Sequence, residues 1–308
     1  MRDVAVVSYA SSTTPKDDIH NEVEMLGPVL REVMAGSGIA RGDIGFVCSG
    51  SLDYLQGGPF AFVMGLDAVG AWPPIRESHV EMDAAWALYE AWVAIQTGEV
   101  DTALVYGFGK SSLGDVHEIM TLQTDPYYVA PLWPSMVDMA GLQASAATGA
   151  GALIAADDIF PITDGSAAIL LAADDVARKA SKRPAWIRGI EHRIECHGLG
   201  VRDLTISEST RMAAEAARVG DGPVDVAELH AQFRHEEAIL AEAIGLDGHT
   251  TINPSGGPLA ANPIMSAGLM RIGEVAKRIS AGEANRGVAH ATSGPCLQQN
   301  MVVVLEGN

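Results

Sequence analysis

Hydrophobic and polar positions along the chain follow patterns that predict a mixture of helices and strands. The most apolar helical pattern covers residues 84–95, where Ala84, Leu88, Trp92 and Ile95 recur at helical spacing. Few charges interrupt this pattern, so we expect a helix that is buried on nearly all sides. Other helices are predicted at residues 21–35, 207–218, 235–244 and 266–279. Short apolar runs, typical of strands covered on both faces, occur at residues 4–9, 44–49, 102–106, 164–172, 186–191, 286–292 and 301–305.

The predicted elements form two series with the same plan: strand, helix, strand, buried helix, strand. We therefore predict an α/β protein with an N-terminal half at residues 1–143 and a C-terminal half at residues 161–308, which the strand at 164–172 opens. Between them, residues 144–160 are rich in Ala and Gly and are expected to form a linker or a helix. Two aromatic-rich segments, 54–74 and 127–137, suit an interface, a pocket wall or the core equally well.

Composition narrows the class of protein. Nearly half of the 308 residues (48%) are hydrophobic, which favours packed α/β layers over disorder. The net charge of −19 argues against a nucleic-acid partner, because phosphate binding needs a basic surface. No apolar stretch is long enough to span a membrane, and residues 1–9 lack the pattern of a signal peptide, so a cytoplasmic location is expected.

Four segments resemble a known family through their order and spacing. They are 97–107 (TGEVDTALVYG), 228–233 (ELHAQF), 253–257 (NPSGG) and 293–296 (SGPC). Together they are similar to the thiolase superfamily, in particular to sterol-carrier-protein-X thiolases and to the lipid-transfer-type relatives found among bacterial steroid-degradation proteins. The resemblance implies two five-stranded α/β halves packed in layers (αβαβα), with a coenzyme A thioester as substrate and no tightly bound cofactor.

Two departures from this family concern its chemistry. In thiolases the buried helix begins at a cysteine that becomes acylated, whereas here the corresponding region contains Glu81, Met82, Asp83 and Ala84. The histidine of the family's GHP motif, which activates that cysteine, is replaced by Asn262. An amide cannot act as a base near neutral pH, and no thiol is present to form an acyl-enzyme, so ordinary thiolysis is not expected.

Three candidate catalytic residues remain: His230, Asn262 and Cys296. Either His230 donates a hydrogen bond to a thioester oxygen or it is a satisfied core histidine. Cys296 transfers a proton or is a small buried hydrophobic residue. For Glu81 and Asp83 we favour charge complementarity with a helix N-terminus over catalysis.

Other site residues follow from the same resemblance. Gly256, Gly257 and Gly294 are expected to shape turns and to let a substrate approach closely. No metal site is expected, because the histidines are not spaced as ligands and the three cysteines, Cys48, Cys196 and Cys296, form no metal or disulfide pattern. The loop domain that covers the thiolase site is expected to be reduced or missing at residues 144–160.

Two functions remain open. The first, which the missing catalytic groups favour, is a non-catalytic subunit that supports a thiolase-like or aldolase complex in acyl-CoA catabolism of lipids or steroid side chains. Such a subunit would form a homodimer, or a heterodimer with a thiolase-like partner, and would work with a small acyl-CoA-binding accessory protein. The alternative is an acyl-CoA carbon–carbon lyase that uses retro-aldol or retro-Claisen chemistry. In the lyase, His230 and Asn262 would hold the thioester oxygen, and Cys296 or a carboxylate would move the proton.

Overall fold

The N-terminal half of the chain contains a five-stranded sheet. The computed structural model describes residues 2–149, 151 and 154–307. In this sheet the strand order is β1-β5-β4-β2-β3. Pairing is antiparallel between β1 and β5 and between β5 and β4, and parallel from β4 through β2 to β3. The strands are β1 (Val4–Thr14), β2 (Phe46–Gly50), β3 (Glu77–Val80), β4 (Thr102–Lys110) and β5 (Ile162–Ala173).

The C-terminal half repeats this topology. Its strand order is β6-β11-β10-β7-β8, with antiparallel pairing from β6 through β11 to β10 and parallel pairing from β10 through β7 to β8. The strands are β6 (Ala185–Ile194), β7 (Val226–Glu228), β8 (Thr251–Ile252), β10 (Arg286–Ser293) and β11 (Gln299–Glu306). The two sheets join where β1 pairs with β6 over two residue pairs. The equal strand orders confirm the predicted plan of two similar five-stranded halves.

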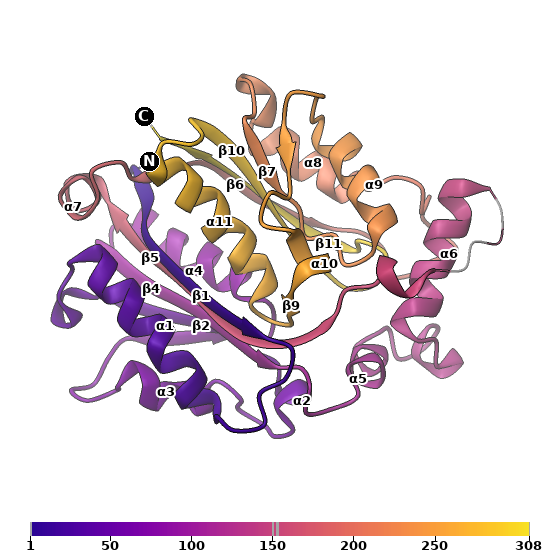
Figure 1. Cartoon of the computed structure of the whole chain (residues 1–308), viewed down its shortest axis with the longest axis horizontal. Coiled ribbons are helices and arrows are strands. Elements are labelled where there is room, and N and C mark those ends of the chain that lie inside the picture. Colours follow the sequence, from indigo (N-terminus) through magenta and orange to yellow (C-terminus); the bar gives the residue numbers. More distant parts are fainter. Residues whose placement is uncertain (1, 150, 152–153, 308) are drawn as a thin grey trace.

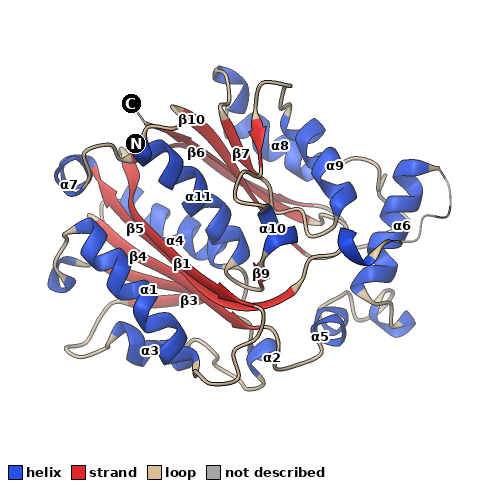
Figure 2. Ribbon diagram, viewed as in Figure 1, coloured by secondary structure: helices blue, strands red, loops and turns tan. Residues whose placement is uncertain are grey.

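Helices and sheets alternate in five layers (Figures 1 and 2). Helices α4 (Ala84–Gln96) and α11 (Ala267–Ala281) lie between the two sheets, where Leu88, Ile95, Leu269 and Ile272 belong to one buried core. The outer layers are α1 (Glu22–Ser37) with α3 (Val63–Val69) on the N-terminal sheet, and α8 (Glu208–Ala216) with α9 (Arg234–Ile244) on the C-terminal sheet. The structure therefore confirms the predicted αβαβα arrangement and the buried helix.

Shorter elements complete the chain. The helices are α2 (Asp53–Gln56), α5 (Val116–Leu122), α6 (Met136–Thr148), α7 (Asp174–Ala180) and α10 (Gly257–Ala260). The 3-10 turns are η1 (Arg41–Asp43), η2 (Ala130–Leu132), η3 (Ala156–Asp158) and η4 (Val219–Asp221). A two-residue strand, β9 (Asn262–Pro263), pairs with the start of β5 and so ties the segment before α11 to the N-terminal sheet.

The assignment of the strand at 164–172 to the second series was wrong. This strand is β5, and it lies between β1 and β4 in the N-terminal sheet. It therefore closes the first series, and the second begins with β6. The predicted division of the chain into halves at residues 1–143 and 161–308 stays a prediction.

The connection between β4 and β5 is longer than the predicted region 144–160. It runs from residue 111 to residue 161 and contains α5, η2, α6 and η3. The Ala/Gly run begins inside α6, and residues 150, 152 and 153 of that run lie outside the described residues. In Figure 1, α6 lies at the far right of the view, beyond α9, and α5 lies between α6 and α2. Within the described part of the chain, no helix is long and apolar enough to cross a membrane.

Candidate active site

A cavity of about 260 Å³, partly open to the surface, lies where the two halves meet the β4–β5 connection. One wall comes from the approach to α4, and others come from the β7–α9 loop, the segment before α11 and the turn between β10 and β11. The β4–β5 connection closes it with mostly apolar side chains. The lining residues with polar or reactive side chains include Glu81, Asp83, Gln123, His230, Gln232, Glu236, Asn262, Thr292, Ser293, Cys296, Gln298 and Gln299.

This cavity brings together most of the predicted site residues. His230, Asn262, Cys296, Gly294, Glu81, Met82 and Asp83 all line it. Three predicted residues are not part of its lining: Ala84, Gly256 and Gly257.

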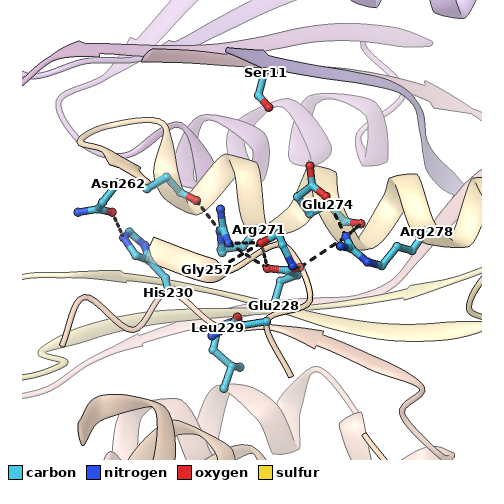
Figure 3. Close-up of polar contacts among 12 residues, drawn as sticks. Ser11, Glu228, Leu229, His230, Gly257, Asn262, Arg271, Glu274 and Arg278 are labelled. Carbon is cyan, nitrogen blue, oxygen red and sulfur yellow. Dashed lines mark hydrogen bonds and ion pairs between the residues drawn. The ribbon is translucent and has the colours of Figure 1, made fainter. Parts of the chain in front are cut away.

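His230 and Asn262 form a buried pair at the centre of the site (Figure 3). The Thr292 backbone N–H donates to His230 Nδ1 at 3.4 Å, so that nitrogen is the acceptor and Nε2 carries the proton. His230 Nε2 therefore donates to Asn262 Oδ1 at 3.2 Å. Burial, together with the nearby His290 and Arg271, lowers the pKa of His230 to about 3. His230 is thus a neutral side chain whose two nitrogens are both engaged.

Asn262 has one hydrogen-bond donor left over. Its backbone N–H donates to Thr163 Oγ1 at 2.8 Å, and its Oδ1 accepts from His230. Among the described residues, no acceptor lies within reach of its side-chain nitrogen Nδ2, although only 1% of Asn262 is exposed. An unpaired buried donor costs about 1–3 kcal/mol, which is unusual unless a ligand or water completes it. This N–H group is therefore placed to bind an oxygen atom in the cavity.

An ion pair behind His230 fixes the turn that we matched to the NPSGG motif. Glu228 is fully buried, and its Oε2 accepts from Arg271 Nη1 at 2.9 Å and from Ser255 Oγ at 2.6 Å. Asn253 Oδ1 accepts from the Leu229 backbone N–H at 2.7 Å. Figure 3 shows Glu228 and Arg271 of this network beside the His230–Asn262 pair. Segments 228–233 and 253–257 are thus fixed to each other by these hydrogen bonds, and the backbone that positions His230 is fixed with them.

Gly256 and Gly257 belong to this turn. Their φ angles are +90° and +60°, which disfavour residues with a Cβ. A Cβ on Gly257 would also lie 3.0 Å from the Asn253 side chain. Their role in turn geometry follows from these values, while the contact with substrate that we predicted for them stays a prediction.

Asp83 connects the N-termini of both central helices. Its carboxylate accepts from the backbone N–H groups of Ala85 in α4 at 2.8 Å, Gly268 in α11 at 2.8 Å and Leu269 in α11 at 3.1 Å. Burial raises the pKa of Asp83, and these three hydrogen bonds oppose that shift. The favoured interpretation, charge complementarity at a helix N-terminus, therefore describes Asp83. Glu81 also lies at a helix N-terminus, but at that of α2, where it accepts from the Asp53 backbone N–H.

Ala84 has a purely structural environment. Its backbone N–H donates to Met265 O at 2.9 Å, and a Cβ on Gly107 of β4 would lie 2.6 Å from the Ala84 Cβ. The first residue of α4 thus packs tightly against β4 and offers neither a reactive atom nor a free N–H to the cavity.

Cys296 is a buried thiol in the turn between β10 and β11. Its Sγ donates to Met139 O at 3.3 Å, which ties this turn to α6. Burial raises the pKa of Cys296 to about 12, and the charge of Glu236 contributes to this shift. At neutral pH this residue is therefore a thiol rather than a nucleophilic thiolate.

Glu236 is a cavity residue that the sequence reasoning missed. It is 3% exposed, and its Oε2 accepts from the backbone N–H groups of Gln232 at 2.8 Å and Phe233 at 3.1 Å. Burial raises its pKa to about 7. The one signal in the sequence is a glutamate three residues after the start of a helix, a spacing that indicates only capping. Across the described parts of the chain, no group of three or more His, Cys, Asp or Glu side chains is placed to hold a metal ion.

Comparisons with known proteins agree with this architecture. No family model matches the chain. An acetyl-CoA acetyltransferase of Methanothermobacter thermautotrophicus is 27% identical over 162 residues, which cover 44% of this chain and 42% of that protein. The match thus spans less than half the length of this curated relative. The crystal structure of human mitochondrial 3-ketoacyl-CoA thiolase in complex with CoA superposes with a TM-score of 0.74 and 13% identity, covering 100% of this chain and 98% of that one. The chain therefore has the thiolase fold that the sequence resemblance predicted.

Proposed function

We propose that this chain binds an acyl-CoA thioester in the cavity and breaks a carbon–carbon bond of the acyl group by retro-aldol chemistry, without an acyl-enzyme. The observation that carries the proposal is the buried, unpaired Nδ2 group of Asn262, a residue that lines the cavity and whose amide is oriented by a hydrogen bond from neutral His230. A preorganised donor of this kind stabilises the oxygen of an enolate as negative charge develops on it. The geometry thus favours the lyase over the supporting subunit.

The side chains at the site support this route over the usual thiolase route. Asp83 and Ala84 occupy the start of α4 with packing and capping contacts, and Cys296 is held as a neutral thiol. Retro-aldol cleavage needs no covalent intermediate. The substrate's β-hydroxyl loses a proton, the Cα–Cβ bond breaks, and the electron pair moves into the thioester carbonyl. One oxyanion donor and one proton carrier are sufficient.

Coenzyme A is the proposed carrier because both compared proteins are named for CoA thioesters, and the human thiolase was crystallised with CoA. The subtype that the sequence resembles supports an acyl group from lipid or steroid side-chain catabolism.

The test is a direct assay of the purified chain with a panel of 3-hydroxyacyl-CoA substrates, with and without a 3-alkyl branch, in which the shortened acyl-CoA and the released carbonyl product are measured. Asn262→Ala is expected to lower kcat by about 100-fold or more, as removal of an oxyanion donor does. Asn285→Ala, an asparagine outside the cavity, serves as the matched control. Equal activity of wild type and Asn262→Ala would exclude the assigned role, and lack of turnover by the wild-type chain would reject the lyase.

A second candidate, the supporting subunit, has one observation in its favour. Strand β3 is the outer strand of the N-terminal sheet, and an aromatic surface lies beside it: Phe62 stacks on His79 of β3 at 3.7 Å, and Phe60 packs against Phe62 and is 68% exposed. A homodimer or a heterodimer with a thiolase-like chain would cover this surface. If the isolated chain is inactive but raises the activity of such a partner or of its acyl-CoA-binding accessory protein, the second candidate replaces the first.

A further inference from the structure

The cavity wall contains five titratable side chains: Glu81, Asp83, His230, Glu236 and Cys296. Four of them are engaged in ways that leave little capacity to move a proton. Asp83 accepts three backbone N–H groups, both nitrogens of His230 are hydrogen-bonded, Cys296 donates to Met139 O, and Glu81 binds the start of α2.

Glu236 differs from these four because only one of its oxygens is used. Oε2 accepts both amides of the β7–α9 loop, which holds the carboxylate in place at the start of α9. Among the described residues, no group donates to Oε1 at all. A carboxyl group that is rigidly held through one oxygen, buried, and open to the cavity through the other has the geometry of a proton carrier.

We propose that Glu236 is the general base and acid of this site, taking the proton from the substrate's β-hydroxyl and returning it to the α-carbon of the enolate. This inference rests on the lyase function proposed above. The oxygen Oε2 remains fixed by the two amides throughout, and Oε1 carries the proton.

The proton balance closes with this single residue. Glu236 removes the proton from the β-hydroxyl as the Cα–Cβ bond breaks and the β-carbon becomes a carbonyl group. The electron pair resides on the thioester oxygen, next to Asn262 Nδ2, until the same proton is delivered to the α-carbon. A 3-hydroxyacyl thioester thus gives a shortened acyl thioester and an aldehyde or ketone, and no oxidant, reductant or acyl acceptor is consumed.

The surroundings of Glu236 suit both steps. Burial brings the pKa of Glu236 to about 7, so that both protonation states are accessible near neutral pH. The nearby Cys296 stays a neutral thiol, and His230 stays neutral, so neither forms an ion pair that would fix the carboxylate in its charged form. The charged carboxylate is accommodated at the N-terminus of α9, where two backbone N–H groups point at it.

The test compares Glu236→Gln with wild type in two assays: cleavage of the 3-hydroxyacyl-CoA panel, and exchange of the α-protons of acetyl-CoA for deuterium in D₂O. Glutamine keeps an oxygen for the Gln232 and Phe233 amides, so the start of α9 is retained. We expect kcat to fall by about 100-fold or more while KM changes by less than about threefold. Glu242→Gln, an exposed glutamate on the same helix, is the matched control and should retain wild-type rates.

The pH profile distinguishes a proton carrier from a structural role. The wild-type rate kcat/KM should rise through a pKa near 7, and Glu236→Gln should lose this limb. Glu236→Asp keeps the carboxylate but withdraws it from the cavity, so it should keep the limb at a lower rate. This second variant also tests the role if Glu236→Gln folds poorly.

Three outcomes decide the matter. Loss of both activities in Glu236→Gln, together with loss of the pH limb, supports the assignment. Unchanged rates or an unchanged pH profile in Glu236→Gln, with activity lost in Asn262→Ala, overturn the role of Glu236 and leave the lyase standing. If the wild-type chain neither cleaves these substrates nor exchanges α-protons, the proposed function fails and this role fails with it.

Discussion

Two buried histidines, His230 and His290, determine how the C-terminal half responds to acid. Burial lowers their pKa values to about 3 and about 4, whereas the unfolded chain binds the same protons with pKa values near 6.5. Between these values the unfolded state binds more protons than the folded state. Protonation of these histidines therefore does not lower the stability of the folded state above pH 6.5. As the pH falls from 6.5 toward 4, each histidine lowers the free energy of unfolding by about 1.4 kcal/mol per pH unit.

Urea unfolding at a series of pH values between 7.5 and 5 measures this effect. We expect the free energy of unfolding to fall below pH 6.5, because the two histidines outweigh Glu236, whose pKa of about 7 in the folded state, against 4.5 in the unfolded chain, has the opposite effect. His290→Gln should make the decline shallower by about 1.4 kcal/mol per pH unit. His249→Gln, which replaces an exposed histidine, is the control and should leave the slope unchanged. An unchanged slope in His290→Gln would show that His290 keeps its ordinary pKa in the folded protein.

Single residues also show where the sequence is informative about the site. His230, Asn262 and Cys296 were found because they stand in segments that resemble motifs, and the structure places all three in the lining of one cavity. Glu236 was missed because its spacing from Phe233 is explained by helix capping alone. Its burial and its unused oxygen depend on the β4–β5 connection and on the β10–β11 turn, which lie far from it in the sequence.

At the level of elements, Asp83 holds α4 and α11 together at their N-termini. Removing its side chain in Asp83→Ala would leave three buried N–H groups unpaired, on Ala85, Gly268 and Leu269. Because each unpaired buried donor costs about 1–3 kcal/mol, we expect a loss of at least about 3 kcal/mol in the free energy of unfolding. Chemical denaturation at pH 7 gives this value directly.

Asp115→Ala provides the comparison for this prediction. Asp115 caps the peripheral helix α5 and accepts from a single N–H group, that of Glu118. Its removal should cost about 1 kcal/mol, as for an ordinary N-cap. Equal losses in the two variants would show that Asp83 acts as a simple cap of α4 and does not connect the two helices.

The elements themselves could be predicted well from hydrophobic periodicity, but their partners could not. The helix at 84–95 and the strands at 286–292 and 301–305 lie close to the observed bounds of α4, β10 and β11. In contrast, the strand that became β5 was assigned to the wrong half. A fully buried strand is apolar on both faces, so its own sequence does not identify the strands it pairs with. The pairing of β5 with β1 joins residues that are far apart in the chain.

At the scale of the whole molecule, the N-terminal sheet ends at β3, which pairs with β2 on one side and has no neighbouring strand on the other among the described residues. Strand β3 lies at the edge of the sheet, with exposed Phe60 and the stacked Phe62–His79 pair beside it. Open edges and exposed aromatic groups of this kind are typical of association surfaces. We therefore expect the chain to form a dimer, with itself or with a thiolase-like partner, that covers β3.

Sedimentation velocity over a range of concentrations tests this expectation. Phe60→Asn should lower the dimer fraction, and asparagine tolerates the positive φ of 59° found at this position. Tyr127→Asn removes an aromatic group that is 80% exposed on the β4–β5 connection, and it should leave the dimer intact. If only Tyr127→Asn weakened association, the interface would lie over the cavity-covering connection instead.

The placement of α4 and α11 between the sheets has a consequence for the newly made chain. The N-terminal sheet has all its strands once residue 173 has been synthesised, and α4 already lies on its inner face. Helix α11, which covers α4 from the other side, begins about 90 residues later. At a synthesis rate of about 5–20 residues per second, the apolar surface of the first half stays uncovered for roughly 5–20 seconds. During that interval the ribosome-bound chain presents an apolar surface of the kind that chaperones bind.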